Sequence, residues 1–307
     1  MKNRSALQFV VIIGIVNFFA DFTYEGARGI VGPFLGSLGA SAAILGLIAG
    51  LGEFMGYTLR SASGYFADKF HRHWIFAFLG YAINTLAVPA LALTAQWPLA
   101  ATLVVAERVG RGIRKPTVDA MLSYAGKSIG AGWVFGLNES LDQAGATIGP
   151  LVMALVLYLN SGFRTGFAVL LIPTLLCLAT LLAARLLHPP PHELEQGAEH
   201  FAPTNLTRAY WIYFAAGALI AAGFADFALI GFHFEKADAV PRDWIPLFYA
   251  VAMASGALAS IPLGRLFDRF GANVSLLALF VSAAAAPLVF LGAFSFALVG
   301  MIFWGSG

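Results

Sequence analysis

The sequence has few charged residues. Asp, Glu, Lys and Arg make up 11% of its 307 residues, whereas soluble globular domains carry about 25%. Hydrophobic residues make up 59%, and the mean hydropathy is +0.80. This composition excludes an ordinary soluble globular protein, and the apolar residues fall in runs long enough to cross a bilayer. The sequence therefore predicts an integral membrane protein with many spans.

Other features of enzymes and cofactor proteins are also missing. The one cysteine, Cys177, lies in an apolar run, where a small packed residue is expected, and it excludes an intramolecular disulfide. The six histidines are scattered, and there is no Gly-x-x-x-x-Gly-Lys loop for a nucleotide. We therefore expect no enzyme, no cofactor and no metal site. The net charge of +2 gives no indication of nucleic-acid binding.

The apolar runs predict nine full helices and the start of a tenth. Each full run holds roughly the 20 residues that cross a bilayer. The expected spans are residues 8–31, 41–63, 74–94, 98–114, 138–158, 165–186, 208–232, 244–263 and 272–292, with the tenth beginning near residue 296. A polar, proline-rich segment at residues 188–207 predicts a linker. It would join a six-helix half, residues 1–187, to an incomplete second half, residues 208–307.

Lysine and arginine favour one side of these spans. That side holds Lys2, Arg4, Lys69, Arg72, Arg114, Lys115, Lys127, Arg265 and Arg269, and the other holds Arg164, Lys236 and Arg242. Cytoplasmic loops carry the excess of positive charge. The amino terminus and the linker are therefore expected in the cytoplasm, and the protein in a plasma membrane, most simply a bacterial inner membrane.

The first span carries a stripe of polar residues. Asn17, Asp21, Glu25 and Arg28 follow a step of three or four residues, so they share one face of a helix. A carboxylate at this depth is costly unless it is paired, hydrated or protonated. Asp21 has no base within reach on its own helix, so it is the candidate proton-binding group. Glu25 and Arg28 could instead form a fixed ion pair.

Three other spans of the first half carry charge. Glu53 lies within the second, and Arg108 lies inside the fourth, where it needs an acid from another helix or an anion in a cavity. Glu139 and Asp142 open the fifth span and are the nearest partners for the bases of the fourth, although a static charge network is an alternative. Arg114 and Lys115 are expected to act only as orientation signals near the cytoplasmic surface.

Two short sequence motifs each occur twice, in the same order. Gly64–Phe70 and Gly264–Phe270 both read Gly, three residues, Asp, a base, Phe, and Phe-Ala-Asp-Phe occurs at residues 19–22 and 224–227. This pattern indicates an internal duplication, which is a building plan of secondary transporters. It pairs Asp21 with Asp226, but the predicted spans of the second half otherwise hold few ionisable groups.

The repeated sequence resembles motifs of the major facilitator superfamily. The signature of that family between helices 2 and 3 is matched here at Gly64, Asp68, Lys69 and Arg72, and again at Gly264, Asp268, Arg269 and Gly271. The first copy departs from it at His71 and His73. Arg108, Arg111 and Gly112 resemble the helix 4 motif, with Arg111 in place of Gln. The helix 5 motif of the antiporter branch is matched in part, at Gly136, Gly145, Gly149 and Pro150, but Met153 and Ala154 replace two expected glycines.

The resemblance implies an all-α polytopic fold of two pseudo-symmetric six-helix halves around a central cavity. It also implies a chain that continues to about residue 390, so that this one would be truncated in helix 10. The implied function is secondary active transport of small organic molecules by alternating access. Efflux by proton antiport is favoured, with nutrient import by proton symport and a non-transporting receptor or scaffold as alternatives. The expected partners are a small substrate, protons and the bilayer, and the expected state is a monomer.

The expected functional residues fall into two groups. The proton or substrate site would comprise Asp21, Glu25, Arg28, Glu53, Arg108, Glu139, Asp142 and Asp226. The cytoplasmic gate implied by the resemblance would comprise Gly64, Asp68, Lys69, Arg72, Gly264, Asp268 and Arg269.

Overall fold

The computed structural model describes residues 3–70, 72–159, 162–187, 245–271 and 273–306, with eight single residues between 208 and 240. Every regular element in these ranges is helical. The α-helices are α1 (Asn3–Ser37), α2 (Ala42–Phe70), α3 (His73–Ala90), α4 (Trp97–Ile129), α5 (Ala131–Tyr158), α6 (Gly162–Val169), α7 (Leu171–Leu187), α11 (Ile245–Phe270), α12 (Asn273–Leu291) and α13 (Phe294–Ser306), and a 3₁₀ turn covers Leu91–Leu93. The linker, Asp226 and the side chain of Asp68 lie outside what the structure describes.

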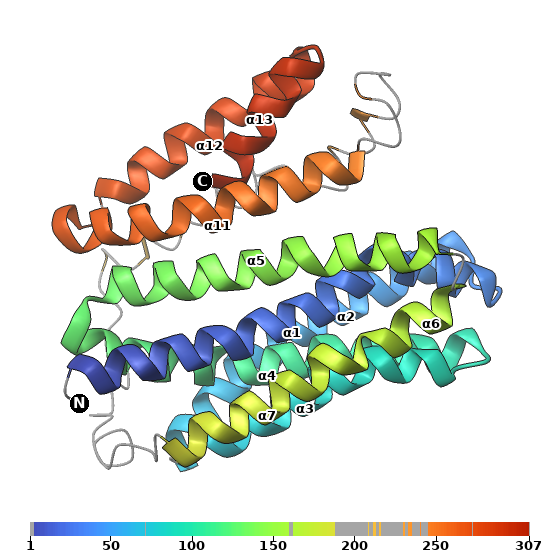
Figure 1. Cartoon of the computed structure of the whole chain (residues 1–307), viewed down its shortest axis with the longest axis horizontal. Coiled ribbons are helices and arrows are strands. Elements are labelled where there is room, and N and C mark those ends of the chain that lie inside the picture. Colours follow the sequence, from blue (N-terminus) through green and yellow to red (C-terminus); the bar gives the residue numbers. More distant parts are fainter. Residues whose placement is uncertain are drawn as a thin grey trace.

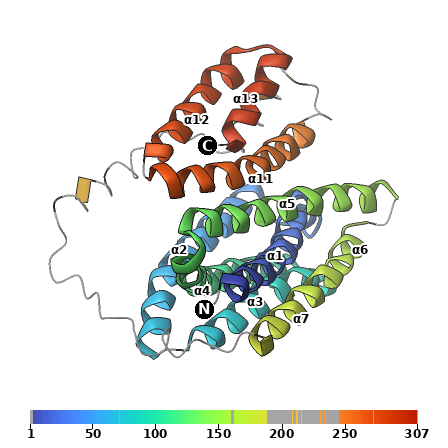
Figure 2. The ribbon, with the colours of Figure 1, turned by 60° about the vertical axis from the view of Figure 1, so that its left-hand side comes forward.

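The helices form two bundles that meet along α5. In the first bundle α1 packs against α5 and α7, while α4 packs against α2 and α3. In the second bundle α13 packs against α11 and α12. Helix α5 lies between α1 of the first bundle and α11 of the second (Figures 1 and 2). The packing of α5 against α11 is therefore the main described contact between the two parts of the chain.

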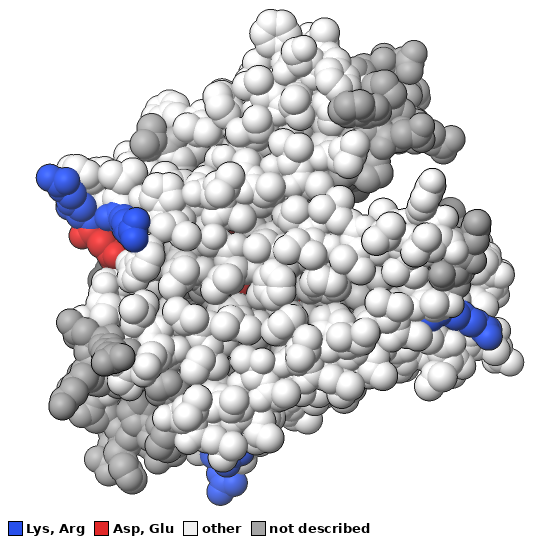
Figure 3. All heavy atoms as spheres, in the orientation of Figure 1, with Lys and Arg blue, Asp and Glu red and all other residues white. Residues whose placement is uncertain are grey.

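The molecule has the surface and the helix lengths of a protein in a bilayer. Six helical segments in the described residues are long and apolar enough to span a membrane: Ser5–Arg28, His73–Leu93, Ala131–Tyr158, Gly162–Leu187, Leu247–Phe270 and Asn273–Leu291. On the face shown in Figure 3, charged side chains gather toward the ends of the helices, and the broad middle is almost free of them. The chain is a multi-pass membrane protein.

Five of the described helices, α1, α2, α4, α5 and α11, are longer than the sequence predicts. α4 does not end near Arg114 but continues to Ile129, and α5 begins at Ala131 rather than near residue 138. The extension of α4 carries Val118, Met121, Leu122 and Ala125 at helical spacing, and all four are buried in the core of the first bundle. The second span was expected to end at residue 63, but Gly64–Phe70 form the last turns of α2. The first copy of the repeated motif therefore forms the carboxyl-terminal end of α2.

Glycines let α3 and α4 approach closely at the level of the polar residues. A Cβ on Gly80 would lie 2.6 Å from the backbone nitrogen of Arg114, and one on Gly110 would lie 2.8 Å from the Cα atom of Asn84. Neither position can hold a larger side chain without separating the two helices. This close approach places Arg114 within reach of residues on α1 and α3.

Candidate functional site

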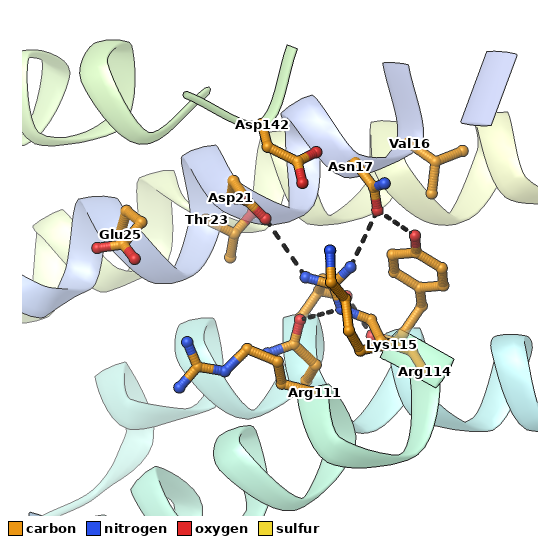
Figure 4. Close-up of polar contacts among 12 residues, drawn as sticks. Val16, Asn17, Asp21, Thr23, Glu25, Arg111, Arg114, Lys115 and Asp142 are labelled. Atoms are coloured by element: carbon orange, nitrogen blue, oxygen red, sulfur yellow. Dashed lines mark hydrogen bonds and ion pairs between the residues drawn. The ribbon is translucent and has the colours of Figure 1, made fainter. Parts of the chain in front are cut away.

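Arg114 is the centre of a buried polar network. Its side chain is 4% exposed, and its guanidinium donates to Asn17 Oδ1 at 3.0 Å, to Asn84 Oδ1 at 3.2 Å and to Asp21 Oδ1 at 3.3 Å (Figure 4). The interpretation of Arg114 as an orientation signal is therefore wrong. Because α4 continues well past this residue, Arg114 lies in the interior rather than at a helix end. It supplies the base that Asp21 lacks on its own helix.

The network joins four helices. Asn17 on α1 donates through Nδ2 to Asn138 Oδ1 on α5 at 2.7 Å and accepts a hydrogen bond from the Tyr81 hydroxyl on α3. The ring of Tyr81 also lies 4.6 Å from the guanidinium carbon of Arg114. Asn138 in turn donates to Asp142 Oδ2 at 3.3 Å. Buried networks of this kind fix the relative positions of the helices that contribute to them.

Sequence reasoning missed Tyr81, Asn84 and Asn138. Tyr81 and Asn84 lie within the apolar run of residues 74–94, and Asn138 stands at the start of an expected span, beside Glu139 and Asp142. The available signal was the polar stripe on α1, since polar side chains buried in a membrane need partners on other helices. Which helices supply them depends on packing, which single-helix periodicity does not contain.

A second cluster of charges surrounds α2 and α4. Arg28 Nη1 lies 2.8 Å from Glu25 Oε1, so these two residues form the local ion pair that the sequence left as an alternative. Arg108 contacts the carboxylate of Glu53 on α2, as expected of a base that needs an acid from another helix. Its Nε atom also lies 3.2 Å from Oε2 of the neighbouring Glu107.

Arg111 and Asn84 tie this second cluster together and connect it to the first. The Arg111 guanidinium lies 3.9 Å from both Glu53 and Glu107. Asn84 donates through Nδ2 to Glu107 Oε1 at 2.8 Å, while its Oδ1 accepts from Arg114. The candidate residues of α1, α2 and α4 therefore lie in one continuous polar region.

The carboxylates at the start of α5 have partners of a different kind than expected. Glu139 accepts a hydrogen bond from Gln143 at 2.7 Å, and Asp142 accepts from Asn138. Within the described residues neither makes an ion pair with a base of α4. Asp142 Oδ1 and Glu25 Oε2 are buried without a hydrogen-bond partner there. A buried carboxylate oxygen in this condition is a place where a proton can be held.

Two cavities adjoin the charged residues. The first, about 270 Å³, lies between α1, α2, α3 and α4 and has mainly aliphatic walls. The second, about 250 Å³, is lined by Arg28, Glu53, Gly56, Tyr57, Arg60, Arg108, Arg111 and Gly112. Arg28 and Arg108 line both, so the aliphatic cavity meets the charged cavity at these two guanidinium groups. Across the described residues no group of His, Cys, Asp and Glu side chains is arranged to hold a metal ion.

The second copy of the repeated motif lies at the contact between α11 and α5. Asp268 at the end of α11 accepts hydrogen bonds from the backbone nitrogens of Gly132 and Trp133, both at 2.7 Å. These are free N–H groups in the first turn of α5, where a carboxylate is favoured by the helix dipole. Gly130 precedes the helix with φ of 101° and offers no side-chain cap of its own. Asp268 therefore caps α5 from the other part of the chain.

Glycines allow the backbones of α5 and α11 to touch beside this cap. A Cβ on Gly264 would meet the carbonyl oxygen of Gly132, and one on Gly136 would meet that of Ser260. Gly145 and Gly149, which also belong to the helix 5 motif, instead face the backbone of α1 at Phe18 and Phe22. The helix 5 glycines thus serve two different helix contacts.

The other residues of the expected gate lie against their own part of the chain or are exposed. A Cβ on Gly64 would lie 3.4 Å from Pro116 of α4, and the ammonium of Lys69 lies 5.6 Å from the centre of the Tyr65 ring. Arg72 follows α2 and is exposed. Arg269 lies over the ring of Phe270 at 5.3 Å. The structure therefore places the second copy of the motif, but not the first, at a described contact between the two parts of the chain.

Proteins of known fold resemble this chain over most of its length. The solved structure of a major facilitator superfamily transporter, FucP, in the outward conformation matches with a TM-score of 0.70 and 14% identity, covering 98% of this chain and 81% of that one. The nucleoside transporter NupG matches with a TM-score of 0.60 and 14% identity, covering 98% and 80%. At this identity the likeness shows the fold alone. It defines the class as a multi-pass helical protein with a transporter fold.

Sequence relatives identify the family. The family model described as Major Facilitator Superfamily matches residues 13–307. An uncharacterized protein of Mycobacterium tuberculosis (strain H37Rv) is 34% identical over 309 residues, which cover 98% of this chain and 76% of that protein. An uncharacterized MFS-type transporter of Methanocaldococcus jannaschii is 32% identical over 165 residues, which cover 53% of this chain and 41% of that protein. The chain belongs to the major facilitator superfamily, and it is a transporter of that type.

Proposed function

We propose that the protein exports small organic molecules from the cytoplasm in exchange for protons, by alternating access. Residues 1–187 and 208–307 would act as two halves joined by the cytoplasmic linker at 188–207, with the amino terminus in the cytoplasm. The observation that carries this proposal is the buried pair of Asp21 and Arg114, 3.3 Å apart in the interior of the first bundle. A titratable carboxylate held at this depth in a transporter fold is a functional group by default.

The surroundings of Asp21 suit reversible proton binding. Arg114 and Lys115 face it from α4, and Asp142 faces it from α5 (Figure 4). When Asp21 is ionised, it balances Arg114; when it takes up a proton, that charge balance is lost and Arg114 must find another anion. Protonation would therefore change the charge of the network that joins α1, α3, α4 and α5. Such a change is what a coupling site has to transmit.

The contact between α5 and α11 would form the cytoplasmic gate. The Asp268 cap and the glycine contacts between α5 and α11 support this proposal, and in the proposed orientation they would hold the cytoplasmic end closed in an outward-facing state. Asp68, the equivalent residue of the first motif copy, would make the matching contact with the other half. Opening toward the cytoplasm would require these contacts to break. Because they are few, the binding of substrate and protons would have to alter only a small number of interactions to shift the conformation.

Proton coupling can be tested by separating driven transport from exchange. Wild-type protein in liposomes is screened with small organic cations, anions and neutral compounds while the internal pH is recorded with an entrapped dye. For a transported compound, Asp21→Asn should abolish accumulation driven by a pH gradient but retain exchange of labelled for unlabelled compound. Asp226→Asn, the repeat counterpart, is the control and should leave coupling intact. Accumulation by Asp21→Asn, or identical behaviour of the two variants, would refute the assignment.

A further inference from the structure

The pair of adjoining cavities indicates the chemical class of the ligand. We infer that the site binds an amphipathic organic anion, whose hydrocarbon body occupies the aliphatic cavity and whose acidic group lies among the arginines of α1, α2 and α4. The inference rests on the proposed function in taking this region as the substrate site. It does not depend on the direction of transport or on the coupling ion.

The aliphatic cavity is suited to a hydrocarbon body. Its walls include Val31, Leu35, Ile48, Val88 and Leu103, and its polar lining groups, Tyr24, Arg28, Glu107 and Arg108, belong to the charged cluster. Its volume of about 270 Å³ is close to the lower end of the range of roughly 300–1,000 Å³ found for small-molecule sites. A ligand that filled only this cavity would be small. One that also entered the second cavity could be of ordinary metabolite or drug size.

The charged cavity has more bases than acids. Its charged lining residues are four arginines and one glutamate: Arg28, Arg60, Arg108, Arg111 and Glu53. Two more carboxylates, Glu25 and Glu107, pair with these arginines from the side. Even with both included, four guanidinium groups face three carboxylates. The excess of one positive charge is carried by Arg60, at an exposed position of α2, and a positive excess at a cavity favours a bound anion over a neutral molecule or a cation.

Arg60 is the base without an acid. Among the described residues it makes no ion pair, and its guanidinium carbon lies 5.4 Å from the centre of the Tyr57 ring. Arg108 and Arg111 share Glu53, whose side chain is 48% exposed and can therefore move aside. An incoming carboxylate, sulfonate or phosphate could take the place of Glu53 and bind the planar guanidinium groups in bidentate fashion.

The inference can be tested with ligands matched in shape. Purified full-length chain in lipid nanodiscs is titrated by calorimetry with naphthalene-2-carboxylate, the neutral naphthalene-2-carboxamide and the cation 2-naphthylmethylammonium, with empty nanodiscs as the blank. The carboxylate should bind about tenfold or more tightly than the amide, because only it pairs with the arginines. The ammonium should bind weakest. An amide or ammonium that binds as tightly as the carboxylate, or a carboxylate that does not bind at all, would overturn the inference.

Variants locate the binding within the two cavities. Arg60→Gln, which breaks no described ion pair, should weaken carboxylate binding about tenfold, and Val104→Trp should obstruct the aliphatic cavity and weaken all three ligands. The matched controls are Arg185→Gln and Ile172→Trp, both on exposed positions of α7. If the cavity variants bind like their controls, the assignment of the cavities is wrong.

The experiments can contradict the inferred ligand class and the proposed transport function independently of each other. Carboxylate binding by a protein that transports nothing in liposomes would contradict transport and leave the ligand class intact. Transport of a cation or a neutral compound, without carboxylate binding, would contradict the ligand class alone.

Discussion

The first bundle and the described part of the second are stabilised by different interactions. Every buried polar or charged side chain of the described residues lies between Asn17 and Thr174, in the first bundle. The buried core of the second consists of apolar residues such as Phe248, Val289 and Met301. The first bundle is cross-linked by buried hydrogen bonds and ion pairs. Helices α11, α12 and α13 are held by apolar packing, by a hydrogen bond from Ser255 to the carbonyl oxygen of Ile302 and by the contacts of α11 with α5.

Under the proposed function, the difference would correspond to separate tasks for the two regions. Removing one member of a buried charged network leaves its partner without a compensating charge. The stability of the first bundle therefore depends on every member of the network being present. An apolar bundle has no such requirement, and a small number of contacts at its edge can form and break. In the proposed function, charge recognition would belong to the first bundle, while the second would move against it. Four substitutions can contradict or sharpen this view.

The largest effect is expected for Arg114→Leu. This change leaves Asp21, Asn17 and Asn84 without a common donor in a buried site and should lower the free energy of unfolding by about 3–5 kcal/mol. Thermal unfolding in detergent, followed by circular dichroism, measures the loss. Arg269→Leu at the exposed end of α11 is the matched control, with an expected change below about 0.5 kcal/mol. Equal losses in both variants would show that the two regions do not differ in this way.

A smaller effect is expected for Gly264→Val at the contact between α5 and α11. The new side chain would collide with the backbone of Gly132 and should separate the helices, at a cost of about 1–3 kcal/mol. The separation can be detected by maleimide labelling of Ser260→Cys in a Cys177→Ser background, because Ser260 faces Gly136 across the contact. Gly46→Val is the control, since its Cβ would meet nothing within 4 Å. Unchanged labelling would exclude this contact as the moving one.

The sequence was sufficient for the fold class, the family and the polar stripe on α1. Periodicity identified Asp21, Glu25 and Arg28 because these residues share one helix, and the local pair of Glu25 and Arg28 required no other helix. The same reasoning found that Arg108 needed an acid elsewhere, and the structure supplies Glu53. These successes depend on spacing along a single helix and on the cost of unpaired charge.

The sequence was not sufficient for contacts between distant helices. Arg114 and Asp21 are 93 residues apart in the chain, and their pairing depends on the continuation of α4 and on the glycine contacts of α3. Local composition instead indicated a loop at residue 115. Asp268 was identified from its motif, but its role as a cap depends on the packing of α11 against the first turn of α5, which the sequence does not contain.

The cap itself gives a third, smaller effect. Asp268→Asn keeps a hydrogen-bond acceptor but removes the charge that favours the first turn of α5, so closure should weaken by about 0.5–2 kcal/mol. Labelling of Ser260→Cys should therefore rise less than with Gly264→Val. Asp119→Asn, which removes a carboxylate paired with Lys115 within α4, is the control and should not change labelling. An increase in that control would mean that labelling responds to charge in general.

The smallest effect is expected for Lys115→Gln, and it sharpens the comparison within α4 itself. Lys115 follows Arg114 directly, but its side chain is 32% exposed, and its ammonium lies 3.6 Å from the carboxylate of Asp119, whose side chain is 38% exposed. Partly solvated pairs of this kind contribute about 0–1 kcal/mol, because water screens the charges and the side chains lose freedom on pairing. Lys115→Gln should therefore unfold close to the wild-type temperature, although its neighbour Arg114→Leu unfolds far below it. A large loss with Lys115→Gln would mean that Lys115, which also faces Asp21 (Figure 4), belongs to the buried network. The boundary between the cross-linked interior and the solvated surface of the first bundle would then lie at least one residue further out.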